Sequence, residues 1–244
     1  MLPCAILCGG LATRLWPATT KIPKSLLPIN GTPFIAHQLS LLQARGLSRV
    51  VLCVGYLGNQ ISDFVGNGSR FGLEVSYSFD GAKLLGTGGA IRHALPLLDD
   101  EFFVLYGDSY LTCNYQAVAD AFRLSGKPAL MTIYRNYDRY DASNIEAVGG
   151  RIVRYDKRNR TPNMNYIDYG LGVFARIAFE LLPESDSADL AGIYRTLLAS
   201  GDLASFELKQ RFYEIGSAEG IQALEGHLAS GGDGLAKIAD DITI

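Results

Sequence analysis

A glycine pair followed by two widely spaced cations stands near the start of the 244-residue chain. Residues 7–15 read LCGGLATRL, and Lys24 follows Arg14 by ten residues within a proline-rich segment. Adjacent glycines let backbone N–H groups approach a phosphate closely, while Thr13 adds a hydroxyl and Arg14 adds a rigid cationic fork. This combination suits the binding of a triphosphate.

Two better-known phosphate motifs do not fit this loop. The dinucleotide fingerprint requires G-x-G-x-x-G before a helix, the P-loop requires G-x-x-x-x-G-K-[ST], and residues 7–15 match neither pattern. We therefore disfavour a Rossmann dehydrogenase and a P-loop enzyme. The plain alternative is an ordinary glycine turn, with Arg14 and Lys24 as solvated surface charges.

A carboxylate ends another apolar run. Asp108 follows Gly107 directly after the apolar residues 102–106, where a side chain can face the glycine-rich loop. Mg²⁺ prefers oxygen ligands such as carboxylates, so Asp108 is a candidate metal ligand. The alternative is a turn aspartate that caps the next segment.

The elements that must carry these groups alternate in the first half of the chain. Apolar runs that stop at glycine predict buried strands, alternation predicts the strand at 73–79, and apolar residues at helical spacing predict helices. We expect strands at residues 3–8, 50–54, 73–79 and 102–106, and helices at residues 34–44, 59–65 and 87–98. This alternation predicts a parallel sheet with helices on both faces.

The second half has a looser pattern, which predicts mixed or antiparallel strands added to the same sheet. We expect strands at 129–134, 144–148, 151–155, 169–175 and 204–208, and helices at 115–124, 178–182, 190–199 and 218–228. The predicted fold class is α/β, with three layers built around a mixed, mainly parallel sheet. We expect one domain over residues 1–229 and a flexible, glycine-containing tail at 230–244.

Composition argues against several kinds of partner. The formal net charge of −3 argues against a general nucleic-acid-binding surface, because such a surface needs an excess of Lys and Arg. No apolar run approaches the roughly 18 residues of a membrane span, and no basic leader precedes the first apolar run. We therefore expect a cytoplasmic protein without membrane association, and we expect its four cysteines to be buried reduced thiols.

Residues 7–33 as a whole resemble the signature loop of the sugar-1-phosphate nucleotidyltransferases. The match fixes about a dozen positions, which makes it far more specific than a short motif. The resemblance continues in the same order through LGTGGA at 85–90, YGDS at 106–109, YDK at 155–157, IDYG at 167–170 and EIGS at 214–217. It implies a Rossmann-like sheet with a nucleotide-binding half, about 1–110, and a sugar-binding half, about 111–229.

The resemblance also implies roles for the loop. Arg14 and Lys24 would hold the phosphates and stabilise charge while the sugar phosphate oxygen attacks the α-phosphorus and pyrophosphate leaves. Such transfers are catalysed mainly by alignment and charge neutralisation. The expected nucleotide-binding residues are Leu7, Gly9, Gly10, Thr13, Gly86 and Thr87, although Thr87 would also serve as a plain helix N-cap.

The same resemblance predicts a Mg²⁺ site at Asp108 and Glu214. Related enzymes have an Asp in an Asp-Ile-Gly motif where this chain has Glu214, and the extra methylene moves the carboxylate oxygens by about 1.5 Å. Ala12 likewise replaces the usual glycine of the loop. Because of these two departures from the family pattern, a homologue that binds nucleotide sugars without catalysis remains an alternative function.

The expected contacts to the sugar phosphate come from the second half. Lys157 matches the lysine of the family's Glu-Lys-Pro motif, with Asp156 in place of Glu, and the set is completed by Asn144, Asp168 and Gly170. The alternative for the run 157–161 is a solvated basic loop.

Short members of the family act on heptose or N-acetylmuramate 1-phosphates. The amino-acid sequences at 85–90 and 106–109 resemble those of a D-glycero-D-manno-heptose 1-phosphate guanylyltransferase most. A UTP-dependent N-acetylmuramate 1-phosphate uridylyltransferase is the alternative. A phosphocholine-type cytidylyltransferase would need an aromatic cage, for example from Tyr137, Tyr140 and Tyr166. The expected partners are an NTP and a sugar 1-phosphate, in a monomer or a small homo-oligomer.

Overall fold

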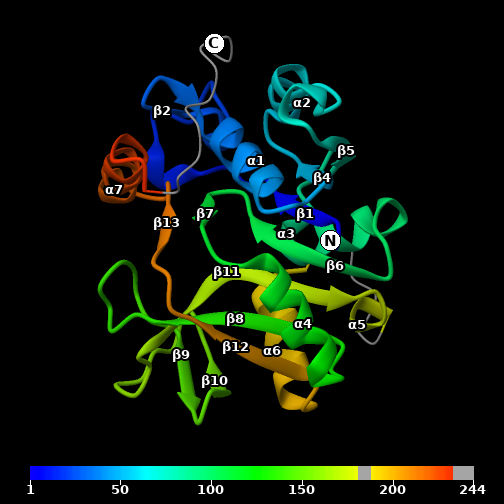
Figure 1. The fold of residues 1–244 in the computed structure, drawn as a ribbon, viewed down its shortest axis with the longest axis vertical. Coiled ribbons are helices and arrows are strands. Elements are labelled where there is room, and N and C mark those ends of the chain that lie inside the picture. Colours follow the sequence, from blue (N-terminus) through cyan, green and yellow to red (C-terminus); the bar gives the residue numbers. More distant parts are fainter. Residues whose placement is uncertain (181–187, 233–244) are drawn as a thin grey trace.

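The structure is a computed structural model that describes residues 1–180 and 188–232. Within these residues the chain forms a nine-stranded mixed sheet flanked by helices (Figure 1). The strand order is β10-β9-β11-β6-β1-β4-β5, and β8 and β12 extend from β11. The α/β prediction is confirmed.

The parallel part of the sheet is built from the first half of the chain. Strand β1 (Cys4–Leu7) lies between β4 (Arg49–Val54) and β6 (Glu101–Tyr106), and β4 pairs with β5 (Glu74–Phe79). All three pairings are parallel, so the carboxyl ends of β1, β4 and β6 lie at one edge. The glycine-rich loop leaves from this edge.

The antiparallel part centres on β11 (Tyr166–Ala175), which pairs with both β6 and β8 (Ala129–Arg135). Strand β12 (Leu203–Leu208) runs parallel to β8, and β9 (Ile145–Val148) forms an antiparallel pair with β10 (Arg151–Tyr155). Strand β11 begins three residues earlier than expected. A register shift after Asp168 interrupts its alternation and hides this first part from a pattern of period two.

Helices cover both faces because neighbouring strand residues point to opposite sides. On one face, a core that includes Ile6 packs against α1 (Phe34–Ala44), α2 (Gly58–Val65) and α4 (Tyr115–Ser125). On the other face, a core that includes Ala5 packs against α3 (Gly86–Ala94), α5 (Ile177–Glu180) and α6 (Leu190–Ala199). The result is the expected three-layer arrangement.

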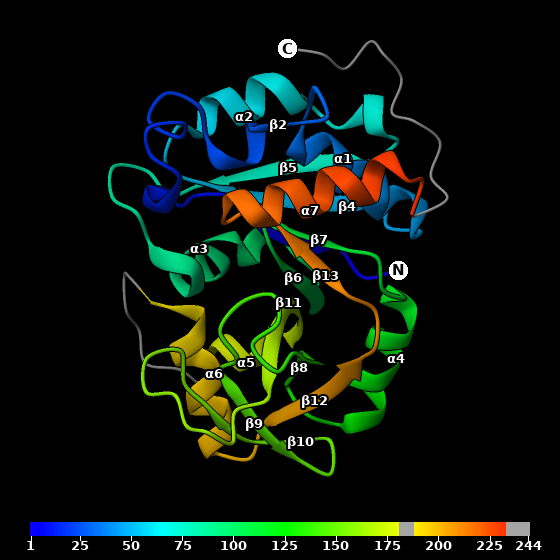
Figure 2. The same cartoon turned by 90° about the vertical axis from the view of Figure 1, so that its left-hand side faces the viewer.

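A small second sheet crosses between the two parts of the molecule. Strand β13 (Phe212–Glu214) pairs with β7 (Ser109–Leu111), and α7 (Ala218–Ala229) follows it. Figure 2 shows β13 running from the part that contains β12 towards the part that contains α7 and β4. A short pair of strands, β2 (Pro28–Ile29) and β3 (Thr32–Pro33), precedes α1. The sequence patterns did not predict any of these four strands.

One expected helix ends earlier than predicted, and two expected segments extend beyond the described residues. The helix expected to reach residue 98 stops at Ala94 and continues as a 3₁₀ turn, because Pro96 cannot donate a helical hydrogen bond. The helix expected at 178–182 is described only as far as Glu180. The expected tail lies outside the described residues from residue 233 onward.

Candidate active site

A cavity of about 800 Å³ lies between the carboxyl ends of β1 and β6 on one side and β11 and its neighbours on the other. Its lining gathers nearly all of the residues predicted from the sequence, although they come from widely separated segments. These residues are Leu7, Gly9, Gly10, Thr13, Arg14, Lys24, Gly86, Thr87, Asp108, Asn144, Lys157, Asp168, Gly170 and Glu214. Their proximity is a structural finding, and their individual roles stay predictions.

The glycine-rich loop is anchored at several points. The backbone N–H of Tyr56 donates to the carbonyl of Gly9 at 3.2 Å, and the buried Thr19 hydroxyl donates to the carbonyl of Ala12 at 2.9 Å. Ala12 has a φ of +50°, in the left-handed region that favours glycine. Arg14 is exposed on the short 3₁₀ turn that follows and lines the cavity.

Gly107 allows the two central strands to meet next to the cavity. Its N–H donates to the Leu7 carbonyl at 3.1 Å, and a Cβ at this position would collide with the same carbonyl oxygen. Only glycine tolerates this approach without a backbone shift. Asp108 is thereby placed directly beside the end of β1.

Lys24 and Asp108 form an ion pair at the base of the cavity. The Lys24 Nζ lies 2.7 Å from Asp108 Oδ2, and the two side chains are 16% and 34% exposed. Burial acts to raise the pKa of Asp108, but the ammonium of Lys24 and, more weakly, Arg14 outweigh it, so the pKa of Asp108 is lowered. Asp108 is therefore held as a carboxylate.

Glu214 reaches the same cavity from β13. Its carboxylate accepts hydrogen bonds from the backbone N–H of Gly216 and from the Ser217 hydroxyl, the latter at 3.2 Å. Burial raises the pKa of Glu214, and the nearby charge of Asp108 adds to the increase. The pairing of β13 with β7 sets Glu214 opposite Ser109, the residue next to Asp108. The two predicted metal ligands are thus brought together by a long-range strand pair.

Gln38 fixes the turn that carries Asp108, and the sequence patterns did not reveal it. The side chain is 1% exposed, and its Nε2 donates to the carbonyls of Tyr106 at 3.2 Å and Ser109 at 2.7 Å. These carbonyls flank Gly107 and Asp108. The sequence does place a polar residue, Gln38, on an otherwise apolar face of the helix. Because a buried amide needs hydrogen-bond partners, this pattern could have indicated a structural role for Gln38.

The donor set fits a magnesium ion that also binds substrate phosphates. Mg²⁺ usually keeps several waters and takes only one or two carboxylates from the protein. Asp108 and Glu214 supply two, whereas the described residues contain no cluster of three or more His, Cys, Asp or Glu side chains able to enclose a metal. A metal at this position would need further ligands from the substrates.

Lys157 lies on a platform of two tyrosines and one aspartate. Its Nζ is 3.6 Å from Asp168 Oδ2 and 5.0 Å from the centre of the Tyr106 ring. Asp168 is 3% exposed and also accepts hydroxyl hydrogen bonds from Tyr106 at 2.9 Å and Tyr155 at 3.2 Å. The Asp168 carboxylate is thus already well bonded, so its main visible effect is to hold Lys157.

Asn144 and Gly170 complete this wall of the cavity. The Asn144 side-chain oxygen accepts from the Asp168 N–H at 3.1 Å, which links β11 to the segment before β9. Gly170 has a φ of +96°, and a Cβ there would lie 2.8 Å from the Ser109 hydroxyl oxygen. Both residues therefore shape the wall through the backbone.

The structure does not place Asp156 with the rest of the set. Its carboxylate accepts from the backbone N–H groups of Arg158 at 2.8 Å and Asn159 at 2.9 Å, and it does not line the cavity. These hydrogen bonds lower the pKa of Asp156 to about 2. Asp156 caps the turn after β10, so of these two motif residues only Lys157 lines the cavity, and its role stays a prediction.

Thr87 does not cap its own helix. Helix α3 has no side-chain cap at its start, and the Thr87 hydroxyl instead donates to Asp189 Oδ1 at 3.0 Å and accepts from the Leu190 N–H at 2.8 Å. Asp189 is the N-cap of α6. Thr87 therefore connects the starts of two helices at the edge of the cavity.

All four cysteines are unpaired and buried, as expected for reduced thiols. None of the described helices is long and apolar enough to cross a bilayer.

The fold and the cavity define an α/β protein in which a glycine-rich loop with two cations faces a pair of carboxylates. Residues 4–223 match the sequence profile of the family described as Nucleotidyl transferase. This match covers most of the chain, so the chain belongs to the nucleotidyl transferase family.

Several relatives act on sugar 1-phosphates by name. The chain is 30% identical over 200 residues to a mannose-1-phosphate guanylyltransferase of Mycobacterium tuberculosis, covering 81% of this chain and 55% of the relative. It is 32% identical over 143 residues to a D-glycero-alpha-D-manno-heptose 1-phosphate guanylyltransferase of Campylobacter jejuni, covering 58% of this chain and 62% of the relative. It is 38% identical over 113 residues to an N-acetylmuramate alpha-1-phosphate uridylyltransferase of Neisseria meningitidis, covering 46% and 49%.

The chain thus spans about half to three fifths of the length of these curated relatives. Among solved structures, HddC from Yersinia pseudotuberculosis, complexed with GMP-PN, superposes with a TM-score of 0.77 at 24% identity, covering 93% of this chain and 100% of that chain. This likeness supports the fold. Members of the family generally use a divalent metal.

Proposed function

We propose that the protein is a sugar-1-phosphate nucleotidyltransferase, which joins a sugar 1-phosphate to an NTP and releases pyrophosphate. The observation that carries this proposal is the convergence of Arg14, Lys24, Asp108, Glu214 and Lys157 on one cavity. Three cations provide for the phosphates of two substrates, and two carboxylates provide for a divalent metal. Family membership and the names of the relatives support the same reaction.

The proposed reaction needs alignment more than a protein nucleophile. An oxygen of the sugar 1-phosphate attacks the α-phosphorus, a new P–O bond forms, and the bond to the β-phosphate breaks so that pyrophosphate leaves. Arg14 and Lys24 hold the triphosphate and stabilise the charge that develops, and Lys157 holds the sugar phosphate. When bound by Asp108 and Glu214, Mg²⁺ would neutralise phosphate charge and help to orient the two substrates.

For the substrates, we propose GTP and D-glycero-D-manno-heptose 1-phosphate. The partial match to the heptose enzyme supports this choice, and the match to the uridylyltransferase keeps UTP and N-acetylmuramate 1-phosphate as the alternative. A GMP-PN-bound structural neighbour is compatible with a guanine nucleotide.

We place the reaction in the cytoplasm, where NTPs are made and thiols such as the four buried cysteines stay reduced.

The aromatic cage that a phosphocholine-type cytidylyltransferase would need is not formed by the three candidate tyrosines. Tyr137, Tyr140 and Tyr166 do not line the cavity. The guanidinium of Arg211 lies 4.2 Å from the centre of the Tyr140 ring, and that of Arg135 lies 5.1 Å from the centre of the Tyr166 ring. These rings already contact cations of the protein, so we do not propose a choline substrate.

A pyrophosphate-release assay tests the proposed function. Purified protein with Mg²⁺ would be incubated with each of GTP, UTP, CTP, ATP and dTTP, paired with heptose, mannose, glucose, N-acetylglucosamine and N-acetylmuramate 1-phosphates. We expect at least one pair to be turned over, and we expect Lys24→Ala to lower the rate by about 10²–10³-fold. The absence of turnover with every pair would contradict the proposal.

A further inference from the structure

The loop between β8 and β9 presents a carboxylate to the cavity that the proposed reaction does not use. Asp141 and Ala142 of this loop line the cavity on the same wall as Asn144 and Lys157, and Asp141 is exposed. Asp141 forms no ion pair with a lysine or arginine in the described parts of the chain. In the described part of the chain, no cation therefore lies within ion-pair distance of this carboxylate at the cavity.

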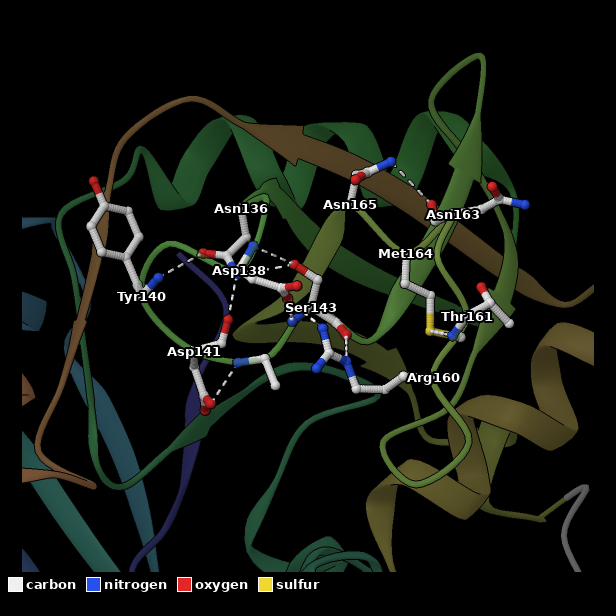
Figure 3. Close-up of polar contacts among 11 residues, drawn as sticks. Asn136, Asp138, Tyr140, Asp141, Ser143, Arg160, Thr161, Asn163, Met164 and Asn165 are labelled. Carbon is white, nitrogen blue, oxygen red and sulfur yellow. Dashed lines mark hydrogen bonds and ion pairs between the residues drawn. The ribbon is translucent and has the colours of Figure 1, made fainter.

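The loop holds Asp141 in one place. The buried Asn136 side chain donates to the Asp141 carbonyl at 2.6 Å and to the Ser143 hydroxyl at 3.1 Å, and it accepts from the Tyr140 N–H at 3.3 Å. Figure 3 shows the Asp141 side chain extending away from this centre, while Asn136 and Ser143 point into it. The backbone of Asp141 is thus held by a buried polar group, and its side chain stays exposed.

A second set of contacts secures the other half of the loop. The Ser143 N–H donates to Asp138 Oδ1 at 2.7 Å, Arg160 forms an ion pair with Asp138, and Arg160 Nε donates to the Ser143 carbonyl at 2.8 Å (Figure 3). Asp138 also has a φ of +57°, a conformation that non-glycine residues rarely adopt. Such a conformation persists only where the surroundings determine it, which indicates an ordered loop.

From this geometry we infer that Asp141 selects the sugar: it hydrogen-bonds the hydroxyls of an uncharged sugar ring and repels a sugar 1-phosphate that carries an additional carboxylate. The inference rests on the proposed function, because it assumes that the sugar lies beyond the phosphate held by Lys157. A carboxylate accepts hydrogen bonds from hydroxyls, whereas two like charges at close range in a partly enclosed cavity strongly disfavour binding. Repulsion of this kind is a general means of rejecting a competing ligand.

The inference separates the two substrate candidates. A heptose 1-phosphate has only hydroxyls on its ring and side chain, whereas N-acetylmuramate 1-phosphate carries a lactyl carboxylate. Asp141 therefore favours the heptose and opposes the muramate. The same argument predicts that uronic acid 1-phosphates are poor ligands.

The test compares matched neutral and acidic ligands as competitive inhibitors of the accepted sugar 1-phosphate. One pair is glucose 1-phosphate and glucuronic acid 1-phosphate, and the other is N-acetylglucosamine 1-phosphate and N-acetylmuramic acid 1-phosphate. In the unmodified protein we expect the acidic member of at least one pair to bind about tenfold or more weakly than the neutral member. In Asp141→Asn we expect the two inhibition constants of that pair to fall within about threefold of each other.

The variant is chosen to keep the loop intact. An asparagine at 141 can still accept the hydrogen bond that the Ala142 N–H now donates to Asp141 Oδ1 at 2.6 Å. Asp141→Ser provides a second variant without the charge, and Asp63→Asn on the exposed surface of α2 provides a control with the same change in net charge. The control should preserve the discrimination, and the KM for the NTP should change little in either Asp141 variant.

Two results would overturn the inference. One is equal binding of neutral and acidic ligands to the unmodified protein, and the other is a difference that persists in both Asp141 variants. A failure of the proposed function gives a different result, because no sugar 1-phosphate would then be turned over with any NTP. That result would remove the basis of the inference as well.

Discussion

The Lys24 ammonium lies 2.7 Å from a carboxylate oxygen of Asp108, which we propose as a metal ligand. In this arrangement the lysine neutralises the carboxylate that a divalent cation would use. We infer that a metal and Lys24 compete for Asp108 until a triphosphate arrives, when its phosphate oxygens give the ammonium another partner. The ion pair would thus couple metal binding to nucleotide binding.

This competition predicts the metal affinity of a variant without nucleotide. In Lys24→Met the repulsion from the ammonium is lost, so Mn²⁺ used as a probe should bind at least several-fold more tightly than to the unmodified protein, while turnover falls by about 10²–10³-fold. Isothermal titration calorimetry measures the first quantity and pyrophosphate release the second. Lys24→Met combined with Asp108→Asn serves as the control and should lose the added affinity. Unchanged Mn²⁺ affinity in Lys24→Met would argue against competition.

The two carboxylates should affect stability in opposite directions. Burial, aided by Asp108, raises the pKa of Glu214, so its charged form destabilises the fold at pH 7, and Glu214→Gln should stabilise the metal-free protein by up to about 1 kcal/mol. Lys24 outweighs burial and lowers the pKa of Asp108, so Asp108→Asn should destabilise by about 1 kcal/mol, a modest value for a partly exposed pair. Urea unfolding in EDTA measures both differences.

The pH dependence of these differences provides a further check. The destabilising effect of Glu214 disappears as the pH falls through its raised pKa towards the ordinary value of 4.5, so the advantage of Glu214→Gln should shrink over that range. The contribution of Asp108 is present above its ordinary pKa of 3.8 and is lost only as the pH falls below that value. Stability changes of the same sign at pH 7 would contradict this assignment.

Gln38 is expected to act through Asp108. Gln38→Leu keeps the approximate volume of the side chain but removes both hydrogen bonds to the carbonyls of Tyr106 and Ser109. Two buried acceptors lose their partner, which should cost about 1–3 kcal/mol of unfolding free energy, and turnover should fall because the turn is no longer fixed. The KM for Mg²⁺ should rise more than the KM for the sugar 1-phosphate. A loss of stability alone, with normal kinetics, would show a purely structural role.

Asp168 should influence the sugar phosphate through Lys157. Asp168→Asn removes the negative charge beside the Lys157 ammonium but retains an acceptor for the hydroxyls of Tyr106 and Tyr155. We expect the KM for the sugar 1-phosphate to rise about tenfold with little change in the KM for the NTP, because the lysine is less well held. Lys157→Ala provides the comparison and should raise the same KM further. If Asp168→Asn raised the KM for the NTP instead, a role at Lys157 would be ruled out.

Ala12 permits a test of the loop itself. Its φ of +50° costs about 1–2 kcal/mol in a residue with a Cβ, whereas glycine adds about 0.5–1 kcal/mol of entropy to the unfolded chain. Ala12→Gly should therefore be neutral or slightly stabilising and should stay active. Ala12→Val should lower turnover, because a β-branched residue resists this conformation and would displace the loop. Thermal unfolding and pyrophosphate release compare the three proteins, and a clearly destabilised glycine variant would contradict this reading of the loop.

Much of the sheet could be predicted because its signals are local. Helix α1 has the predicted bounds, Phe34–Ala44, and β6 begins one residue before the expected start. Apolar runs that end in glycine marked β1, β4 and β6, and alternation of apolar and polar residues marked β5. The sequence patterns did not predict strands β7 and β13, because three residues are too few to show alternation and because their pairing joins segments a hundred residues apart.

The sequence predicted most residues of the candidate site, but it did not predict the direction of every side chain. Motif positions such as Arg14 and Asp108 reach the cavity because each follows a glycine turn at the end of a strand, and Lys24 reaches it from the short 3₁₀ turn that follows Pro23. Asp156 matched a motif position next to Lys157, but its carboxylate turns back to the chain at Arg158 and Asn159. Adjacency in sequence does not fix the direction of a side chain in a turn.

The cross-strand pairing that brings Glu214 opposite Ser109 has a consequence for the making of the protein. A ribosome delivers the glycine-rich loop, Lys24 and Asp108 long before β13 is synthesised. The segments of the parallel sheet and the glycine-rich loop therefore precede β13 in synthesis, and the second carboxylate is added only when residues 212–214 emerge. A partly synthesised chain would carry the glycine-rich loop, Lys24 and Asp108, but the pair of acidic groups would still be incomplete.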